Sequence, residues 1–137
     1  MTDRFAIGTR MAHEWTVREA DTVRSRGTVD FAVLATPSLI FMLEDTCVFA
    51  VSGLLKAGEA TVGTSVHVDH LAATAVGERV RVECDLVSVR GRRLVFRVQA
   101  RCGSLLIARG LHERALVNAE HFTAGTAAQA AAPPLTR

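Results

Sequence analysis

The sequence predicts an α+β domain in which a five-stranded antiparallel sheet wraps around one long apolar helix. Two observations favour this fold. The segment from Thr36 to about Ser52 begins with a helix-start signature and is apolar on nearly every side, so it requires burial on most of its faces. The four segments that follow alternate between apolar and polar residues and are joined by short turns, as neighbouring antiparallel strands are.

Composition indicates one globular domain. The 137 residues suffice for a sizeable core, and a content of 49% hydrophobic and 22% charged residues excludes a disordered chain. Basic and acidic residues number 16 and 14, which leaves no electrostatic footprint for a nucleic acid. The first ten residues contain no apolar core of signal-peptide length, and no apolar stretch is long enough to span a bilayer. We therefore expect a cytoplasmic protein that binds neither membranes nor nucleic acids.

The first strand and the helix have clear local signals. Residues 11–17 alternate and predict a strand. Thr36 followed by Pro37 predicts a helix start, with Thr36 as the N-cap and Pro37 at the first helical position, and Gly53 predicts the helix end. One five-stranded sheet cannot cover so apolar a helix alone, so we expect a homodimer or a larger homo-oligomer.

The segment from Val62 to His70 predicts the second strand. Its even positions, which end at His70, are expected to face the core, and the odd positions, which include Gly63, are expected to face the opposite side. Gly63 also interrupts a run of β-branched residues, and such a glycine often marks the close approach of a backbone or a ligand.

Three further strands complete the predicted sheet. Residues 80–86 alternate, and Val87 and Val89 break the parity, which predicts a β-bulge. Residues 94–102 alternate after a tight turn, and a last strand is expected over about 105–118. One sheet curled around one apolar helix is the hot-dog arrangement.

The end of the chain differs in composition. We expect the hot-dog domain to cover residues 1–122, and an Ala/Pro-rich tail with little to bury to cover 123–137. The odd number and wide spacing of the cysteines predict buried free thiols, as expected in a reducing compartment: Cys47, Cys84 and Cys102.

Two residues with unusual surroundings could carry chemistry. The neighbours of Glu44 one helical turn away are all apolar, so its carboxylate would be desolvated unless a donor or a water-filled cavity served it. Asp45 has a similar setting, and the helix alone does not decide between the two acids. His70 could act as a base near neutral pH, although a lone histidine on an apolar strand face is more often structural.

Thr36 also has two readings. Helix capping explains it, but a helix N-terminus offers free N–H groups to a developing oxyanion as well. On one straight helix Thr36 and Glu44 lie about 12 Å apart. A shared site would therefore need a substrate between them, a Thr36 outside the helix or a second subunit. No His, Cys and Asp cluster has the spacing of metal ligands, so no metal is expected.

These residues lie in four ordered motifs that resemble the fluoroacetyl-coenzyme A thioesterase group of the hot-dog superfamily. The similarity runs from about Arg4 to Phe122. It rests on the spacing of Thr36 and Glu44, on VGTSVHVDH with Gly63 and His70, on SVRGRRL at 88–94 and on GLHERALVNAEHF at 110–122.

The resemblance implies an acyl-CoA thioesterase. Its catalytic residues would be Thr36, Glu44 and His70, which selects Glu44 over Asp45. Gly63 would line the thioester pocket. Arg114 of the HER motif is placed with the substrate-binding residues, although an ion pair with a strand neighbour would equally explain it.

Phe31 and Arg93 complete the expected substrate site. The family has an aromatic-rich segment before its threonine, whereas this chain has only Phe31 there, which departs from the pattern of an enzyme selective for a fluorinated acyl group. We expect a short or medium acyl group. Coenzyme A would enter as part of the substrate, with its phosphates near the turn of Arg90 to Arg93, and no cofactor is expected. Two alternatives share the fold: a non-catalytic acyl-CoA-binding module, and a hydratase or dehydratase of acyl thioesters.

Overall fold

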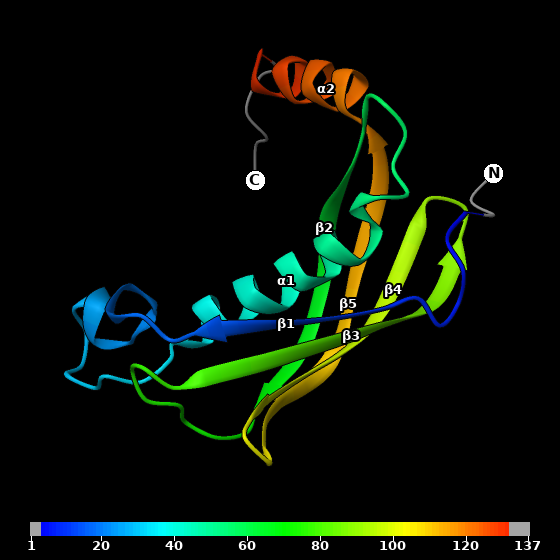
Figure 1. Ribbon diagram of the computed structural model, residues 1–137. Helices are drawn as coiled ribbons and strands as arrows, with labels where there is room; N and C mark the ends of the chain where they lie inside the picture. Colours follow the sequence, from blue (N-terminus) through cyan, green and yellow to red (C-terminus); the bar gives the residue numbers. More distant parts are fainter. Residues whose placement is uncertain (1–3, 132–137) are drawn as a thin grey trace.

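The computed structural model describes residues 4–131 and confirms the predicted order of one strand, one long helix and four strands (Figure 1). Two short 3₁₀ helices, η1 and η2, precede the long helix, and a second helix follows the last strand. The bounds are β1 Arg10–Thr16, η1 Glu19–Asp21, η2 Arg24–Arg26, α1 Thr36–Ser52, β2 Glu59–His70, β3 Arg79–Arg90, β4 Arg93–Cys102, β5 Leu105–Asn118 and α2 Ala119–Ala131.

The five strands form one antiparallel sheet in the order β1-β3-β4-β5-β2, and α1 lies across one of its faces (Figure 1). Strands β3, β4 and β5 are consecutive neighbours because tight turns join them. Strands β1 and β2 form the two edges. The hot-dog arrangement expected from the sequence is therefore the observed fold.

The core lies between α1 and the sheet. The buried face of α1 packs against alternate residues of the strands, as the apolar pattern predicts. Its main members are Leu39, Met42, Leu43, Cys47, Val51, Val80, Val82, Leu86, Leu94, Phe96 and Val98. The described residues cover the opposite side of α1 only in part, because Phe41 is 56% exposed and Phe49 is 37% exposed.

Two β-bulges shift the faces of the strands. The predicted bulge in β3 is present, since the register with β4 shifts between Leu86 and Ser88. A second bulge, between Gly63 and Ser65 in β2, was not predicted. It reverses the expected parity of the first half of β2, so that Gly63 and His70 both face α1. The expectation that Gly63 faces away from His70 is wrong for this reason.

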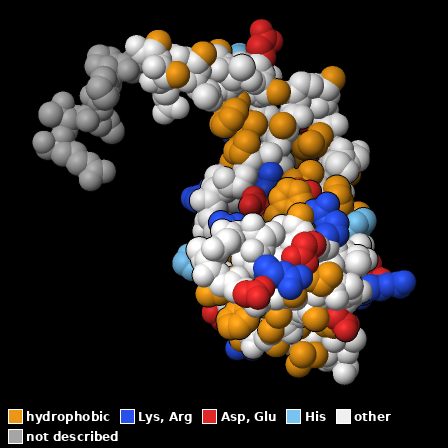
Figure 2. Space-filling view, turned by 90° about the vertical axis from the view of Figure 1, so that its left-hand side faces the viewer, with side chains coloured by type: hydrophobic (Ala, Val, Ile, Leu, Met, Phe, Trp, Pro, Cys, Tyr) orange, Lys and Arg blue, Asp and Glu red, His pale blue; other side chains and the backbone are white. Residues whose placement is uncertain are grey.

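The C-terminal part of the described chain is helical. Helix α2 lies beyond the ends of β2 and β5 at one end of the molecule (Figures 1 and 2), and none of its residues is buried. The alanine-rich composition suits a helix, which the sequence analysis did not predict. The rest of the expected tail, residues 132–137, lies outside the described residues. Within residues 4–131 no helix is long and apolar enough to cross a membrane.

The cysteines are free thiols. Cys47 on α1 and Cys84 on β3 are buried, as predicted, and Cys102 at the end of β4 is only half-buried.

Gly110 provides a test of the fold. It lies in β5 opposite Val68, and an added Cβ would collide with the backbone carbonyl oxygen of His67. Because a backbone atom cannot swing aside, we expect Gly110→Ala to lower the free energy of unfolding by about 1–3 kcal/mol or more. Thermal unfolding of the variant measures this loss.

Gly53→Ala is the matched control, since Gly53 has a φ of −73° and an added Cβ would meet no atom within 4 Å. Equal unfolding temperatures for the two variants would contradict the close packing of β2 and β5.

Candidate active site

Thr36 and His70 form the first polar cluster of the candidate site. The Oγ1 atom of Thr36 lies 2.8 Å from Nδ1 of His70, within hydrogen-bond distance. The N-cap of α1 is Ala35, and no side chain caps the helix. The predicted capping role of Thr36 is therefore wrong, and its hydroxyl bonds instead to the last residue of β2. The helix N-terminus beside it leaves backbone N–H groups free to bind a developing negative charge.

An open groove of about 350 Å³ adjoins this cluster. Apart from Thr36 and His70, its lining is apolar and comes from the segment before α1 and the turn after β2: Val23, Val33, Leu34, Leu71, Ala72 and Ala73. The volume is at the small end of the range of ligand pockets, which suits a small apolar group beside two polar side chains.

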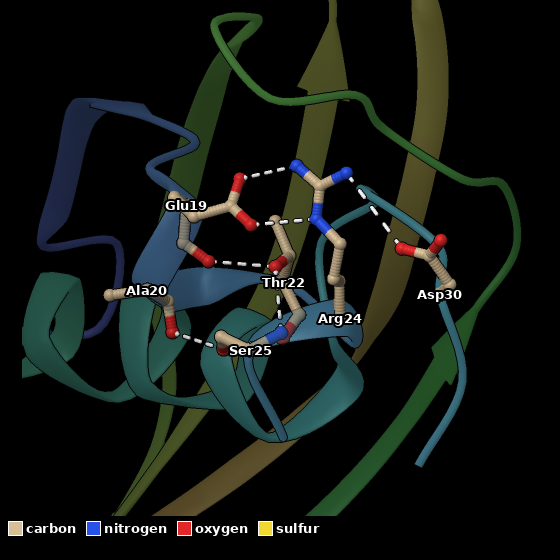
Figure 3. Close-up of polar contacts among 6 residues, drawn as sticks. All are labelled: Glu19, Ala20, Thr22, Arg24, Ser25 and Asp30. Atoms are coloured by element: carbon tan, nitrogen blue, oxygen red, sulfur yellow. Dashed lines mark hydrogen bonds and ion pairs between the residues drawn. The ribbon is translucent and has the colours of Figure 1, made fainter. Parts of the chain in front are cut away.

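The segment before α1 is held by its own polar contacts (Figure 3). Arg24 donates from Nε and Nη2 to the two carboxylate oxygens of Glu19, each at 2.8 Å, and its Nη1 lies 3.8 Å from Asp30. The backbone N–H of Val23 donates to the carbonyl of Val33. These contacts fix the wall that carries Val23 and Val33 into the groove.

Glu44 and Arg114 form the second cluster. Oε2 of Glu44 accepts a hydrogen bond from Nη1 of Arg114 at 3.2 Å. The Glu44 side chain is 35% exposed, whereas that of Arg114 is only 7% exposed. Asp45, the alternative acid, instead lines a separate hollow of about 540 Å³ with Trp15 and Phe41. The structure thus gives a cationic partner to Glu44, as a carboxylate among apolar residues requires.

Arg114 is held on its other side by Thr61. Nε of Arg114 donates to Oγ1 of Thr61, and Nη2 donates to the Thr61 carbonyl, both at 2.9 Å. Two bonds to one residue of the adjacent strand hold the Nε and Nη2 edge of the guanidinium group. The side chain therefore presents Nη1 toward α1 and Glu44.

His112 completes the second cluster and is 1% exposed. Its Nδ1 lies 2.9 Å from the carbonyl of Ser65, which can only accept, so Nδ1 carries a proton. Its Nε2 lies 3.1 Å from Nη1 of Arg114, which can only donate, so Nε2 is unprotonated. Burial is the main cause that lowers the pKa of His112, and the charge of Arg114 lowers it further. His112 is therefore a neutral imidazole of defined tautomer.

Gly63 makes room for the second cluster. An added Cβ would lie 2.6 Å from Oε2 of Glu44, 3.2 Å from Cε1 of His112 and 3.4 Å from Nη1 of Arg114. The sequence predicts a close approach at Gly63, and in the structure these three side chains make it. The cause is the β2 bulge, which turns Gly63 toward α1.

The other two expected substrate-binding residues are placed differently. Phe31, in the loop before α1, is 63% exposed and is not among the residues that line the groove. Arg93 lies on the sheet face opposite α1, because Leu94 beside it points into the core, and it pairs there with Glu113 at 2.9 Å. Sequence reasoning missed His112 and Thr61. The i, i+2 spacing of His112 and Arg114, which places both on one strand face, was the available signal.

The two clusters define a class of protein: a hot-dog domain that presents a Thr–His pair and a Glu–Arg pair with a buried arginine on the face of the sheet covered by its helix. Comparison with known proteins agrees with this class. The family model described as fluoroacetyl-CoA-specific thioesterase matches residues 17–120. The fluoroacetyl-CoA thioesterase of Streptantibioticus cattleyicolor is 39% identical over 130 residues, which cover 90% of this chain and 94% of that protein.

Solved structures agree with the sequence comparison. A solved structure of fluoroacetyl-CoA thioesterase superposes with a TM-score of 0.84 at 37% identity, over 94% of this chain and 98% of that chain. A hot-dog-like protein from Thermanaerovibrio acidaminovorans superposes with a TM-score of 0.88 at 23% identity, over 96% and 98% of the two chains, which supports the fold alone. The chain belongs to the fluoroacetyl-CoA-specific thioesterase family.

The neutral state of His112 predicts a pH dependence of stability. Because the folded pKa lies below the ordinary value of 6.5, the unfolded chain takes up this proton first as the pH falls. The free energy of unfolding should therefore decrease as the pH drops from about 7 to about 5. Denaturant unfolding at several pH values should show a smaller decrease in His112→Gln, which has no imidazole to protonate.

The effect of His112 on stability falls in a different pH range from the effects of the paired carboxylates. Hydrogen bonds from Arg18 and Arg4 lower the pKa values of Asp21 and Glu59, so their contributions are lost only below about pH 4.5. Identical slopes for wild type and His112→Gln between pH 7 and 5 would contradict a buried neutral His112.

Proposed function

We propose that this protein hydrolyses the thioester bond of a short or medium acyl-CoA, with Thr36, Glu44 and His70 as its catalytic residues. The observation that carries the proposal is the 2.8 Å contact between Thr36 Oγ1 and His70 Nδ1 beside the apolar groove at the start of α1. An acyl group in the groove would place its carbonyl near both side chains and near the free N–H groups of the helix terminus.

Each residue has a distinct proposed role. His70 would polarise the thioester carbonyl or move protons during cleavage, and the Thr36 hydroxyl would position the attacking group. Glu44 would orient and deprotonate water, or attack the carbonyl directly to form an anhydride. In both routes an acyl–sulfur bond breaks, water supplies the oxygen of the carboxylic acid, and the thiol of coenzyme A leaves with a proton.

The distance between the two clusters has a consequence for the oligomeric state. Eight residues of α1 place Thr36 and Glu44 about 12 Å apart, so Glu44 needs either a substrate that spans this distance or a second copy of the chain. We propose a homodimer. Its support is the 12-residue edge strand β2, whose free backbone groups can pair with another strand.

Relatives indicate the substrate class. One related crystal structure is a mutant of fluoroacetyl-CoA-specific thioesterase in complex with fluoroacetate and CoA. For this chain we propose coenzyme A as part of the substrate, without a separate cofactor. The Arg90–Arg93 turn borders a hollow of about 240 Å³ on the outer face of the sheet. Its guanidinium groups suit phosphates, but a substrate in the groove would have to reach them around the sheet or in another copy.

Thiol release from a panel of acyl-CoAs tests the proposal. The panel runs from acetyl-CoA to decanoyl-CoA and includes phenylacetyl-CoA and fluoroacetyl-CoA. We expect turnover of a short or medium member, and a loss of about 100-fold or more in kcat for Glu44→Gln, because general acid–base catalysis contributes this much. A hydratase would change the acyl chain without releasing thiol, and a binding module would bind without turnover.

Asp45→Asn is the matched control. Asp45 is the neighbouring carboxylate on α1 and faces Trp15 and Phe41 rather than Arg114. We expect this variant to keep wild-type turnover. Equal losses in Glu44→Gln and Asp45→Asn would argue against a specific role for Glu44.

Gly63→Ala tests the position of Glu44. The added methyl group would meet the end of the Glu44 side chain at 2.6 Å, and that end can swing away. We therefore expect a small loss of stability together with a decrease of about 10-fold to 100-fold in kcat, because a shift of about 1 Å at a reacting group has this effect. The measurements are thermal unfolding and thiol release, and unchanged kcat would contradict the predicted displacement.

A further inference from the structure

His112 is a core residue of β5, yet it contacts several polar groups. It is fully buried, yet both ring nitrogens have hydrogen-bond partners, one on β2 and one on β5. Its Nε2 also lies 3.6 Å from Oε2 of Glu44 on α1. The ring therefore lies where three elements of the candidate site meet.

The hydrogen-bond donors of Arg114 indicate the role of His112. Nη1 of Arg114 carries two hydrogens, and it has two partners, Nε2 of His112 at 3.1 Å and Oε2 of Glu44 at 3.2 Å. Each partner can therefore accept one of the two hydrogens. The other bonds of the guanidinium group go to Thr61 and hold its Nε and Nη2 edge, so the position of Nη1 depends on its own two partners.

The protonation state of His112 is essential to this arrangement. With a proton on Nδ1, held by the Ser65 carbonyl, the lone pair of Nε2 is free to accept from Arg114. A proton on Nε2 would instead face the hydrogens of Arg114 and remove the acceptor. The Ser65 carbonyl is next to the β2 bulge, where the ladder of backbone hydrogen bonds is locally disrupted.

We propose that His112 is a positioning residue that acts through Arg114: as a neutral imidazole it accepts one Nη1 hydrogen and thereby holds Nη1 where its other hydrogen reaches the carboxylate of Glu44. This inference rests on the proposed thioesterase function, in which Glu44 takes part in the chemical step. His112 itself does not touch the substrate. Its effect is on the orientation of the carboxylate.

Two substitutions separate this role from simple packing. In His112→Asn the amide nitrogen lies near the position of Nδ1 and can donate to Ser65, but nothing reaches Arg114. In His112→Gln the longer side chain places an amide oxygen near the position of Nε2, so that an acceptor for Arg114 is kept. His121→Asn, on the exposed helix α2, is a control for loss of a histidine.

We expect a decrease of about 100-fold in the kcat of thiol release for His112→Asn, because misorientation of a reacting group has an effect of this size. KM should stay near its wild-type value, since the contact serves the chemical step and not ground-state binding. His112→Gln should recover most of this kcat, to within about fivefold of wild type, and His121→Asn should match wild type. Unfolding temperatures measured on all variants identify any that fail to fold.

Three results would overturn the proposal. The first is wild-type kcat in His112→Asn, and the second is an equal loss in the Asn and Gln variants, which would indicate packing alone. The third comes from ¹⁵N NMR of the histidine rings in the wild-type protein, which reports the tautomer directly. A proton on Nε2 of His112 at neutral pH would exclude the acceptor role.

The NMR measurement also separates this inference from the proposed function. If the wild type releases no thiol from any acyl-CoA, the proposed function fails. The His112 tautomer would still establish or exclude the hydrogen bond to Arg114 without any reference to turnover.

Discussion

The ion pair between Glu44 and Arg114 is the constraint on which the rest of the site depends. Glu44 lies on a helix that is otherwise almost wholly apolar, and a charge in such surroundings needs a partner. Arg114 supplies the charge, but it is more deeply buried than Glu44 and needs partners of its own. Thr61 and His112 meet that need, which explains why four polar side chains gather between α1 and the sheet.

The backbone of β2 is shaped around this pair. Without the bulge between Gly63 and Ser65, the alternation of the strand would turn a different residue toward α1 at this point. With the bulge, Gly63, which has no side chain, lies next to the carboxylate of Glu44, and His70 at the end of the strand still lies beside Thr36. Both clusters thus depend on a single extra residue in the same strand.

Apolar periodicity predicted the helix, the strands and the β3 bulge, because these depend on contacts that repeat along the chain. The β2 bulge was not predictable, since valine, threonine and serine suit either face of a strand. In the middle of β5 the usual burial of apolar residues is reversed: Leu111 is 48% exposed, while His112 and Arg114 are buried. Glu44 explains the reversal, but it lies 70 residues away from Arg114 in the chain, and no local pattern carries that information. Helix capping likewise offered a local explanation for Thr36, whose hydroxyl in the structure lies within hydrogen-bond distance of His70.

Each of the two clusters includes a residue of β2, the strand at one edge of the sheet. Gly63 marks the Glu44 cluster and His70 marks the Thr36 cluster, and both residues are on the edge strand β2. A two-fold axis perpendicular to the sheet pairs such strands antiparallel. If the axis passed between Val66 and His67, it would place the Gly63 end of the second copy beside His70. Glu44, which lies about 12 Å from Thr36 along one helix, would then have a counterpart in the second copy across the interface. This geometry links the catalytic proposal to the assembly.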